Sequence, residues 1–339
     1  MITLKRSGMP VNQLAEASIV ASARIHLGLI SMHAGGPRMN GGIGFAIVNP
    51  IANVNAKLNY RFTIRDSRPI PLLEHELDEL IRDVEVVRLE NGLRPATITI
   101  FGPIRSHVGM GSGTAIRLAI LEALFALNGQ SPADKALVAN SKRGGTSGVG
   151  VTSYFSGGMI LDLGRPTDGS LPTPSSQSNR LVSAATILPT LRMPDWPLCV
   201  CIPERIRAKT QREEVEFFER VLPLAIQDSY RTCYEAVFGI YAAVKDHDYQ
   251  AFCRAVTSIQ TTTWKALEWN EYGGALQRLK GQVERFGVDC VGMSSLGPSL
   301  FCFATPQTLA RLVEAQLSLN CEIYKTRPNN SGRVLRLLP

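Results

Sequence analysis

The sequence lacks the features that place a protein in or across a membrane. No apolar run in its 339 residues approaches the length needed to span a bilayer, and the opening MITLKRSGMPVNQ has no apolar core of a signal peptide. It also lacks a CxxC pair and any Cys/His spacing typical of zinc, and its seven cysteines are scattered through apolar segments. We therefore expect a cytoplasmic protein with no membrane partner, whose thiols are reduced and buried.

The usual signs of nucleic-acid binding, a dense basic run or an aromatic stacking motif, are missing as well. The chain nevertheless carries a formal net charge of +7, with 27 Arg against 9 Lys. Arginine can hold phosphate or carboxylate through two parallel hydrogen bonds, and a basic cleft raises the encounter rate of an anionic ligand. We therefore expect small anionic substrates and no nucleic acid, although a generic basic surface would give the same totals.

The predicted strands and helices are clustered and do not alternate regularly. Residues 18–48 have the pattern of a strand hairpin, and further strands are predicted at 96–102, 157–164, 197–203, 288–304 (two strands around a turn) and 321–328. Helices are predicted at 71–92, 115–129, 131–141 (with Ser131 as N-cap), 212–227, 230–244, 248–269, 274–287 and 306–319. This order favours an α+β fold. The length suits about two domains, which we place at 1–175 and 176–339, because 164–180 is rich in Pro, Gly and Ser.

The segment HVGMGSGTAIRLAI, from His107 to Ile120, carries the strongest local signal for a binding site. A predicted strand leads into glycines and hydroxyls, and a helix follows at once. Glycine lets backbone N–H groups approach an anion, and the helix N-terminus adds partial positive charge. The segment is neither a Walker A loop nor GxGxxG. A tight structural turn is the alternative to a phosphate site formed by Gly109, Gly111, Ser112, Gly113 and Thr114.

A second glycine-bracketed turn, VGMSSLGPSLFCF, joins two apolar predicted strands in the second half of the chain. Taken alone, it could equally be an ordinary hairpin connection. Two such loops in one chain make a shared anion site more plausible than either loop does separately. On that basis Ser294 and Ser295 are candidate ligands from the second half.

Together with ARIHLGLI and RGGTSGVG, these loops resemble the GHMP kinase superfamily, and more narrowly its non-kinase branch, the β-ribofuranosylaminobenzene 5′-phosphate synthases. The resemblance extends from Ala23 to the terminal TRPNNSGRV. It implies the GHMP two-domain fold, with an N-terminal ribosomal-protein-like α/β half and a C-terminal ferredoxin-like α+β half. It also implies a homodimer. Three positions depart from the branch as we expect it: Asn40, Ala115 and Leu296 stand where Asp, Gln and Trp are usual.

The resemblance further implies a reaction of methanopterin biosynthesis. Phosphoribosyl pyrophosphate (PRPP) condenses with 4-aminobenzoate or 4-hydroxybenzoate, pyrophosphate and CO₂ leave, and a C-riboside forms with Mg²⁺ as cofactor. No carboxylate pair is assigned to the metal, and Ser112 is a possible ligand. Ordinary phosphoribosyltransferases carry an acidic pair before a small-residue loop, which this sequence lacks, so the glycine loops would have to bind PRPP.

One position separates the synthase from its kinase relatives. Kinases of the superfamily carry Ser-Gly-x-Asp where this chain has Ser147, Gly148, Val149 and Gly150. A kinase uses that carboxylate to help deprotonate an alcohol, whereas the ring carbon of an aromatic acid has no proton to lose. A carboxylate would also repel the anionic substrates. An alternative is an ATP-dependent small-molecule kinase whose base has moved, for example to Asp162, and a third is a non-catalytic phosphate-binding regulator.

The remaining candidates are cationic or could become so. Arg24 and His26 lie two residues apart on a predicted strand and should point the same way, either to recognise carboxylate or phosphate or to form a salt-bridged strand end. His107 could assist the leaving pyrophosphate or bond the backbone of its own loop. Arg143 could clamp a phosphate or carboxylate, or lie on a solvated face. We expect Arg24, His26, His107 and Arg143 to act in catalysis, and Ser147, Gly148 and Gly150 to line the substrate.

Overall fold

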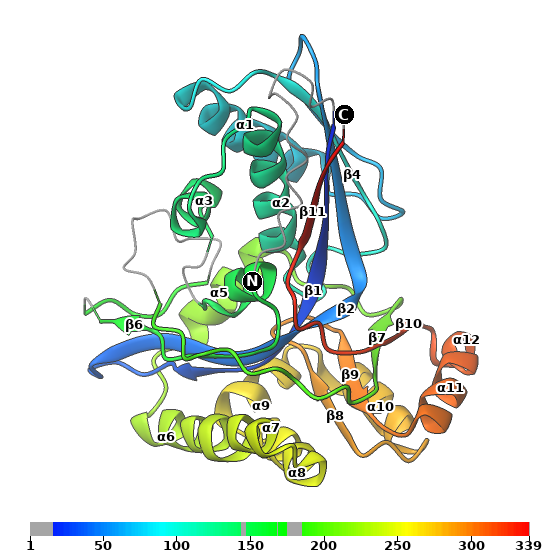
Figure 1. Cartoon of the computed structure of the whole chain (residues 1–339). Coiled ribbons are helices and arrows are strands. Elements are labelled where there is room, and N and C mark those ends of the chain that lie inside the picture. The colour runs from blue at the N-terminus through cyan, green and yellow to red at the C-terminus, as the bar shows by residue number, and fades with distance from the viewer. Residues whose placement is uncertain (1–15, 144–146, 168, 175–184, 339) are drawn as a thin grey trace.

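A computed structural model describes residues 16–143, 147–167, 169–174 and 185–338. Within them the chain forms two sheets, each with its own helices. In Figure 1 the larger sheet and helices α1–α4 occupy the upper part of the molecule, and the smaller sheet lies below them.

The larger sheet is built on a long hairpin, as residues 18–48 predict. β1 (Glu16–Ser31) pairs antiparallel with β2 (Arg38–Leu58), and the ladder is irregular on both sides of the stretch Arg24–His26. The sheet runs in the order β11-β1-β2-β4-β3, with β5 and β6 also paired to β2. The other strands are β3 (Thr63–Asp66), β4 (Ala96–Phe101), β5 (Met159–Asp162), β6 (Arg165–Pro166) and β11 (Val334–Leu338).

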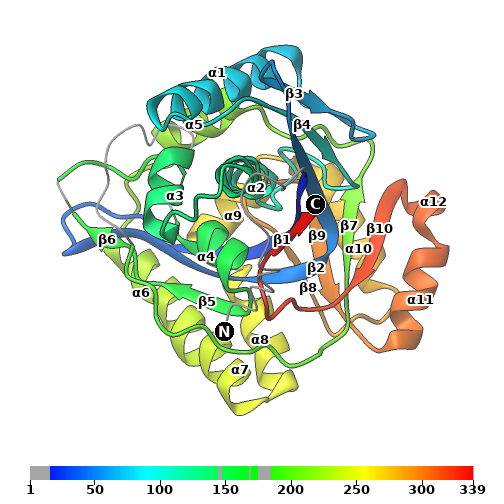
Figure 2. The same ribbon diagram turned by 45° about the horizontal axis from the view of Figure 1, so that its top comes forward.

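Four helices cover one face of this sheet. They are α1 (Glu74–Glu90), α2 (Ser112–Leu127), α3 (Asp134–Ser141) and α4 (Val149–Phe155). Figure 2 shows α2 nearly end-on, with the sheet on one side and the other three helices around it. Most of its sixteen residues are buried, which fits an almost entirely apolar sequence. Because α2 cannot shift without disturbing this core, its N-terminus is held in a fixed place.

The second half forms an antiparallel sheet in the order β10-β7-β9-β8. Its strands are β7 (Leu198–Pro203), β8 (Cys290–Met293), β9 (Leu300–Phe303) and β10 (Cys321–Thr326). Its helical segments are α5 (Gln211–Val221), α6 (Ile226–Tyr234), the π-helix η3 (Glu235–Tyr241), α7 (Ala242–Asp246), α8 (Tyr249–Ile259), α9 (Thr263–Asn270), α10 (Gly273–Glu284), α11 (Pro306–Glu314) and α12 (Gln316–Leu319). All seven cysteines are free thiols, as predicted.

Several predicted elements were wrong in detail. The segment after Gly148, for which no helix was predicted, is the helix α4, because Val149–Phe155 packs beside α2 instead of extending the sheet. Helix α3 begins at Asp134, with Ala133 and not Ser131 in the N-cap position. The helix expected over 248–269 is divided into α8 and α9. Strand β11, which returns to the first sheet beside β1, was not predicted at all.

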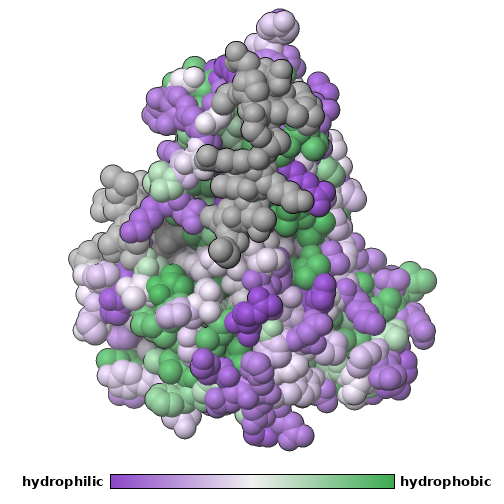
Figure 3. Space-filling view, in the orientation of Figure 1, coloured by the Kyte–Doolittle hydropathy of each residue, from purple (hydrophilic) through white to green (hydrophobic). Residues whose placement is uncertain are grey.

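The α+β prediction with a sheet in each half is confirmed. The domain boundary at 175/176 falls within 175–184, outside the described residues, and stays a prediction. No helix in the described ranges is long and apolar enough to cross a membrane. On the face drawn in Figure 3, hydrophobic residues lie in small separate groups among hydrophilic ones.

Candidate active site

The Gly-rich loop ends at the N-terminus of α2, as the sequence predicts. Gly111 occupies the N-cap position with φ +73° and offers no side-chain cap. The Ala115 N–H donates to Gly111 O (3.2 Å), whereas the N–H groups of the first turn, 112–114, precede the intrahelical ladder. Unpaired N–H groups and the positive end of the helix make this turn suited to an anion, each such interaction being worth ~0.3–1 kcal/mol.

The two glycine turns, which lie far apart in the sequence, touch through their backbones. A Cβ on Gly109 would lie 2.0 Å from Ser294 O, and a Cβ on Gly297 would lie 2.1 Å from Gly109 N. Gly109 also has φ +81°, a conformation that favours glycine. Only glycine fits either position, so the second turn supports the first from behind.

Arg24 lies directly against this loop. Its Nη1 donates to Gly109 O (2.5 Å), and its N–H donates to Met110 O (3.0 Å). A Cβ on Gly111 would lie 2.9 Å from Arg24 Cγ, so the side chain passes over the helix start. The buried Nε has no hydrogen-bond partner among the described residues. Burial lowers the pKa of Arg24 to about 10, which leaves the guanidinium charged at neutral pH.

Arg143 is the second cation at the helix start. Its Nη2 would lie 3.3 Å from a Cβ on Gly113, yet it makes no hydrogen bond or ion pair with any described residue. The neighbouring cations are occupied, since Arg117 (2.5 Å) and Lys142 (3.0 Å) both pair with Asp83. Burial lowers the pKa of Arg143 to about 10, so it remains charged. We call Gly111–Thr114, with Arg24 and Arg143, the anion cradle.

Gly150 lies beside the anion cradle. It is in the first turn of α4, and a Cβ added to it would lie 3.6 Å from Thr114 Oγ1 and 3.7 Å from Thr114 Cγ2. These are ordinary contact distances, so the backbone leaves room for a side chain. A carboxylate at position 150, where the kinases carry Asp, would point into the region of the Thr114 hydroxyl.

Ser147 and Gly148 form the turn before α4 and are held by a buried carboxylate. Asp162, which is fully buried, accepts from the Gly148 N–H (2.6 Å) and the Gly164 N–H (2.8 Å). Burial raises the pKa of Asp162, while these hydrogen bonds and one from Ser147 oppose the rise. Ser147 Oγ also lies 3.4 Å from His26 Nε2. Asp162 therefore positions the turn and does not reach a substrate.

His26 has a different place from the one expected. It is buried, and burial together with the charges of Arg24 and Lys265 lowers its pKa well below the usual range. A neutral imidazole cannot supply charge to a carboxylate or phosphate. Its backbone is equally engaged, because its N–H donates to Ser294 Oγ (3.1 Å) and its C=O accepts from the Ser295 N–H (3.1 Å). His26 therefore ties β1 to both turns.

Ser294, a candidate ligand in the sequence, is engaged inside the protein. The residue is fully buried, and its hydroxyl donates to Gly109 O (2.7 Å) while accepting from the His26 N–H. Both hydrogen-bonding capacities are used inside the protein. Ser295 is half-buried in the left-handed region at φ +52° and contacts the cradle only through the backbone of β1.

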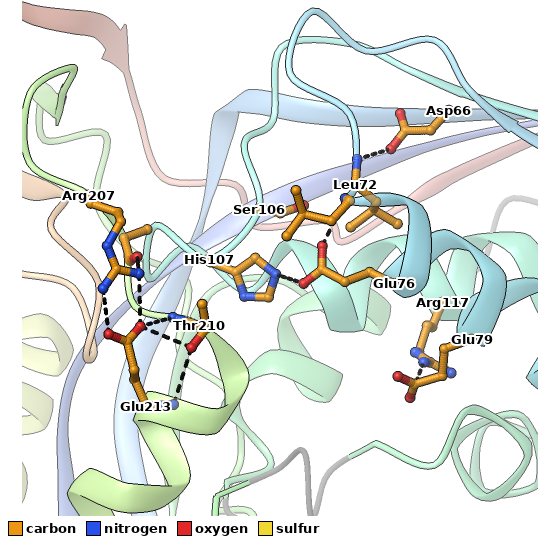
Figure 4. Close-up of polar contacts among 12 residues, drawn as sticks. Asp66, Leu72, Glu76, Glu79, Ser106, His107, Arg117, Arg207, Thr210 and Glu213 are labelled. Atoms are coloured by element: carbon orange, nitrogen blue, oxygen red, sulfur yellow. Dashed lines mark hydrogen bonds and ion pairs between the residues drawn. The ribbon is translucent and has the colours of Figure 1, made fainter.

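His107 lies at the outer edge of the loop. Figure 4 shows its ring directed at Glu76 of α1, with Nε2 2.6 Å from Glu76 Oε1. On the other side of the ring lies the start of α5, where Thr210 caps the helix and Glu213 pairs with Arg207 (2.5 Å). Of the polar contacts of the His107 ring with described residues, the one found is this contact with α1.

One acidic residue of the site was missed by the sequence reasoning. Glu214 is half-buried in a helix start rich in charged residues, and its charge interacts with Arg143, His107 and Arg24. Burial raises the pKa of its carboxyl group, and these cations oppose the rise. A signal was present: Phe217 and Phe218 lie three and four residues further on, which places Glu214 on the same, inward face of α5.

Beneath the site lies a buried ion pair that the sequence did not reveal. Lys265 Nζ donates to Glu268 Oε2 (2.6 Å) and to Met293 O (2.7 Å), with both side chains almost fully buried. Trp264 Nε1 donates to Glu268 Oε1 (2.8 Å). The aromatic rings of Phe217 and Phe218 pack edge-on against Trp264, as helix packing predicts.

The three departures from the expected family pattern are all buried. Asn40 adopts φ +62° next to Gly41, and Ala115 lies in the first turn of α2. Leu296 belongs to an apolar cluster with Leu29, Met32, Phe217, Phe218 and Trp264. A change of residue at position 296 would therefore alter the packing of this cluster.

Comparison with known proteins agrees with this geometry. Residues 79–158, which contain the Gly-rich loop and α4, match the N-terminal domain of GHMP kinases. The β-ribofuranosylphenol 5′-phosphate synthase of Archaeoglobus fulgidus is 28% identical over 91% of this chain and 96% of its own length. That of Methanothermobacter thermautotrophicus is 27% identical over 84% of this chain and 88% of its own. The chain is similar to these synthases over most of its length, and the GHMP match is confined to residues 79–158.

Solved structures of small-molecule kinases share the fold of this chain. Homoserine kinase from Cytophaga hutchinsonii superposes with a TM-score of 0.66 at 16% identity, covering 96% of this chain and 98% of that one. Mevalonate kinase from L. major gives 0.64 at 14% identity, covering 92% and 96%. At such identities the likeness establishes the fold alone, and the expected GHMP-like architecture is confirmed.

Proposed function

We propose that the protein is a decarboxylating C-riboside synthase of methanopterin biosynthesis. It would condense PRPP with 4-aminobenzoate or 4-hydroxybenzoate and release pyrophosphate and CO₂. Synthases that share most of the chain's length carry out the formation of a β-ribofuranosylphenol 5′-phosphate, as their names state. The observation that carries the proposal is the anion cradle with Gly150 at its edge: two charged guanidiniums, a helix N-terminus and no carboxylate where a kinase has one.

The chemistry needs what the cradle offers. The ring carbon that bears the carboxylate attacks the anomeric carbon of PRPP, while the bond to pyrophosphate breaks and its electron pair leaves with that group. The bond to CO₂ then breaks, and its electrons restore the aromatic ring. Arg24, Arg143 and the first turn of α2 would bind the polyanion and stabilise the departing pyrophosphate. Ser112 and Thr114 would add hydroxyl donors at the same turn.

A kinase reading requires a base near the cradle, and Asp162 was the candidate. It is fully buried and accepts hydrogen bonds from two backbone N–H groups. A carboxylate in that position serves the turn of Gly148, so it favours a structural role. The geometry thus argues against a kinase that uses Asp162 as its base.

We also propose that Mg²⁺ accompanies PRPP. The described residues hold no group of three or more His, Cys, Asp or Glu side chains that could bind a metal. Magnesium commonly keeps several waters and binds through substrate phosphates. The ion would therefore enter as a complex with PRPP, with the Ser112 hydroxyl as a possible protein ligand. The homodimer implied by the resemblance stays a prediction for sedimentation analysis.

The test measures the release of the substrate's carboxyl group as CO₂. Purified protein is incubated with Mg²⁺, PRPP and carboxyl-labelled 4-hydroxybenzoate or 4-aminobenzoate. We expect labelled CO₂ in amounts that depend on PRPP, with one pyrophosphate for each CO₂. ADP formation from ATP and a small alcohol, without CO₂ release, would instead establish a kinase.

A further inference from the structure

Glu214 is an acidic side chain whose charge interacts with both arginines of the cradle. The capping box at the start of α5 uses its neighbour: Glu213 Oε2 accepts from the Thr210 N–H (2.8 Å), and Glu213 also pairs with Arg207. Glu214 is thereby left on the inward face. Its carboxylate makes no hydrogen bond or ion pair with the residues that the structure describes.

The surroundings of Glu214 combine cations with a neighbouring apolar cluster. The charged and titratable groups that interact with it electrostatically are Arg143, which follows α3, His107 from the Gly-rich loop, Arg24 from β1 and Glu268 of α9. One helical turn along α5, Phe217 and Phe218 are buried in the cluster that contains Leu29 and Leu296. The two arginines favour the ionised carboxylate.

The polarity of the site then indicates what Glu214 binds. Arg24 Nε, the guanidinium of Arg143 and the first-turn N–H groups of α2 are all donors, and they suit phosphates and carboxylates. Glu214 can only accept when it is ionised. An aromatic acid with a hydroxyl or amino group at the opposite end of its ring has this pattern: an anion at one end, an apolar middle and a donor at the other.

We propose that the Glu214 carboxylate accepts a hydrogen bond from the para hydroxyl or amino group of the aromatic acid. The assignment rests on the proposed synthase function and names the part of its site that selects the substrate. With 4-hydroxybenzoate, the same carboxylate receives the phenol proton as the ring carbon attacks and returns it when CO₂ leaves. No net proton is gained or lost, and the para oxygen supplies the electrons that the ring needs.

The measurement compares binding of 4-hydroxybenzoate with that of benzoate, which lacks the donor. Calorimetric titrations are run with Mg²⁺ and pyrophosphate present, so that no ribosyl transfer occurs and the readout does not depend on turnover. We expect the wild type to prefer 4-hydroxybenzoate by about 10- to 100-fold, the range for a hydrogen bond to a charged group. Glu214→Leu should abolish the preference. Glu214→Gln, with a neutral acceptor of the same shape, should keep part of it.

The control variant is Glu216→Leu, which removes an exposed carboxylate of the same helix whose ion-pair partner among the described residues is Arg212. It should leave the preference unchanged. An undiminished preference in Glu214→Leu would overturn the assignment. So would a raised KM for PRPP with the preference intact, because Glu214 would then bind ribose or the metal complex. If Glu214→Leu does not fold, the ratio of the affinities for 4-hydroxybenzoate and benzoate is measured in Glu214→Gln, and an undiminished ratio there would overturn the assignment.

The pH dependence of the preference for 4-hydroxybenzoate is a second measurement, and a merely structural role of Glu214 would not produce it. Burial raises the pKa of Glu214, so protonation removes its charge at a higher pH than for an exposed glutamate. The preference for 4-hydroxybenzoate should therefore fall as the pH is lowered through that pKa, and Glu214→Gln should show no such fall. If the wild type releases no CO₂ from PRPP, the proposed function fails, whereas a lost para preference alone refutes only the role of Glu214.

Discussion

Substituting Gly150 by Asp tests whether a carboxylate is incompatible with the cradle. An added Cβ at this position lies 3.6 Å from Thr114 Oγ1, so a phosphate bound to that hydroxyl would be on the order of 5 Å from the new charge. Two like charges at that separation repel by about 3 kcal/mol at an effective dielectric constant of ~20. That energy corresponds to roughly a 100-fold loss of affinity.

Neighbouring cations reduce this figure. Arg24 and Arg143 lie at the same helix start, and each would be attracted to the new carboxylate. We therefore expect the KM for PRPP to rise by about 10- to 100-fold in Gly150→Asp, within the Coulomb estimate. The assay is PRPP-dependent release of labelled CO₂ across a range of PRPP concentrations, with 4-hydroxybenzoate held saturating.

Two variants separate charge from bulk. Gly150→Asn adds a side chain of the same shape without the charge, and Gly150→Ala adds only the Cβ. The contacts of 3.6–3.8 Å are ordinary, and alanine favours a helix over glycine by up to ~1 kcal/mol, so both should fold. Equal KM values for PRPP in the Asp and Asn variants would refute the electrostatic argument, and the loss of the base would then need another explanation.

Three further perturbations address the cradle and its support. Ser112→Ala combined with Thr114→Ala should weaken PRPP binding in calorimetric titrations, and an unchanged affinity would remove both hydroxyls from the assignment. Arg143→Met largely keeps the length of the side chain and should raise the KM for PRPP by about 10- to 100-fold, as expected for the loss of a charge-assisted contact. An unchanged KM would mean that the Arg143 guanidinium does not bind PRPP. Lys265→Met leaves Glu268 buried and unpaired and should lower the free energy of unfolding by about 3–5 kcal/mol in urea titrations; a loss below 1 kcal/mol would mean that Glu268 finds water.

The local architecture was largely readable from the sequence because local patterns determine it. The hairpin of β1 and β2, the helix α2 and its glycine-rich start follow from alternation, helical spacing and glycine placement. Where a local pattern was ambiguous, packing decided. The segment after Gly148 contains β-branched and aromatic residues typical of strands, yet it forms α4, because it packs against α2.

Contacts between distant segments were not readable in the same way. Nothing in the glycine pattern states that Gly109 and Gly297 meet backbone to backbone, or that Ser294 bonds the loop instead of a ligand. The sequence indicates both turns as possible binding loops. The sequence does not distinguish a turn that contacts a ligand from a turn that supports its neighbour, since hydroxyl groups and glycines occur in both kinds of turn.

The two turns need their glycines for different reasons. The first turn must leave its N–H groups free and admit Arg24 and Arg143, and the second must approach so closely that no Cβ fits at Gly109 or Gly297. His26 and Ser294, which lie behind the cradle, hydrogen-bond within the protein. Arg24 Nε and the Arg143 side chain make no hydrogen bond with the described residues, and such preorganised donors would stabilise a leaving pyrophosphate without rearranging during the reaction.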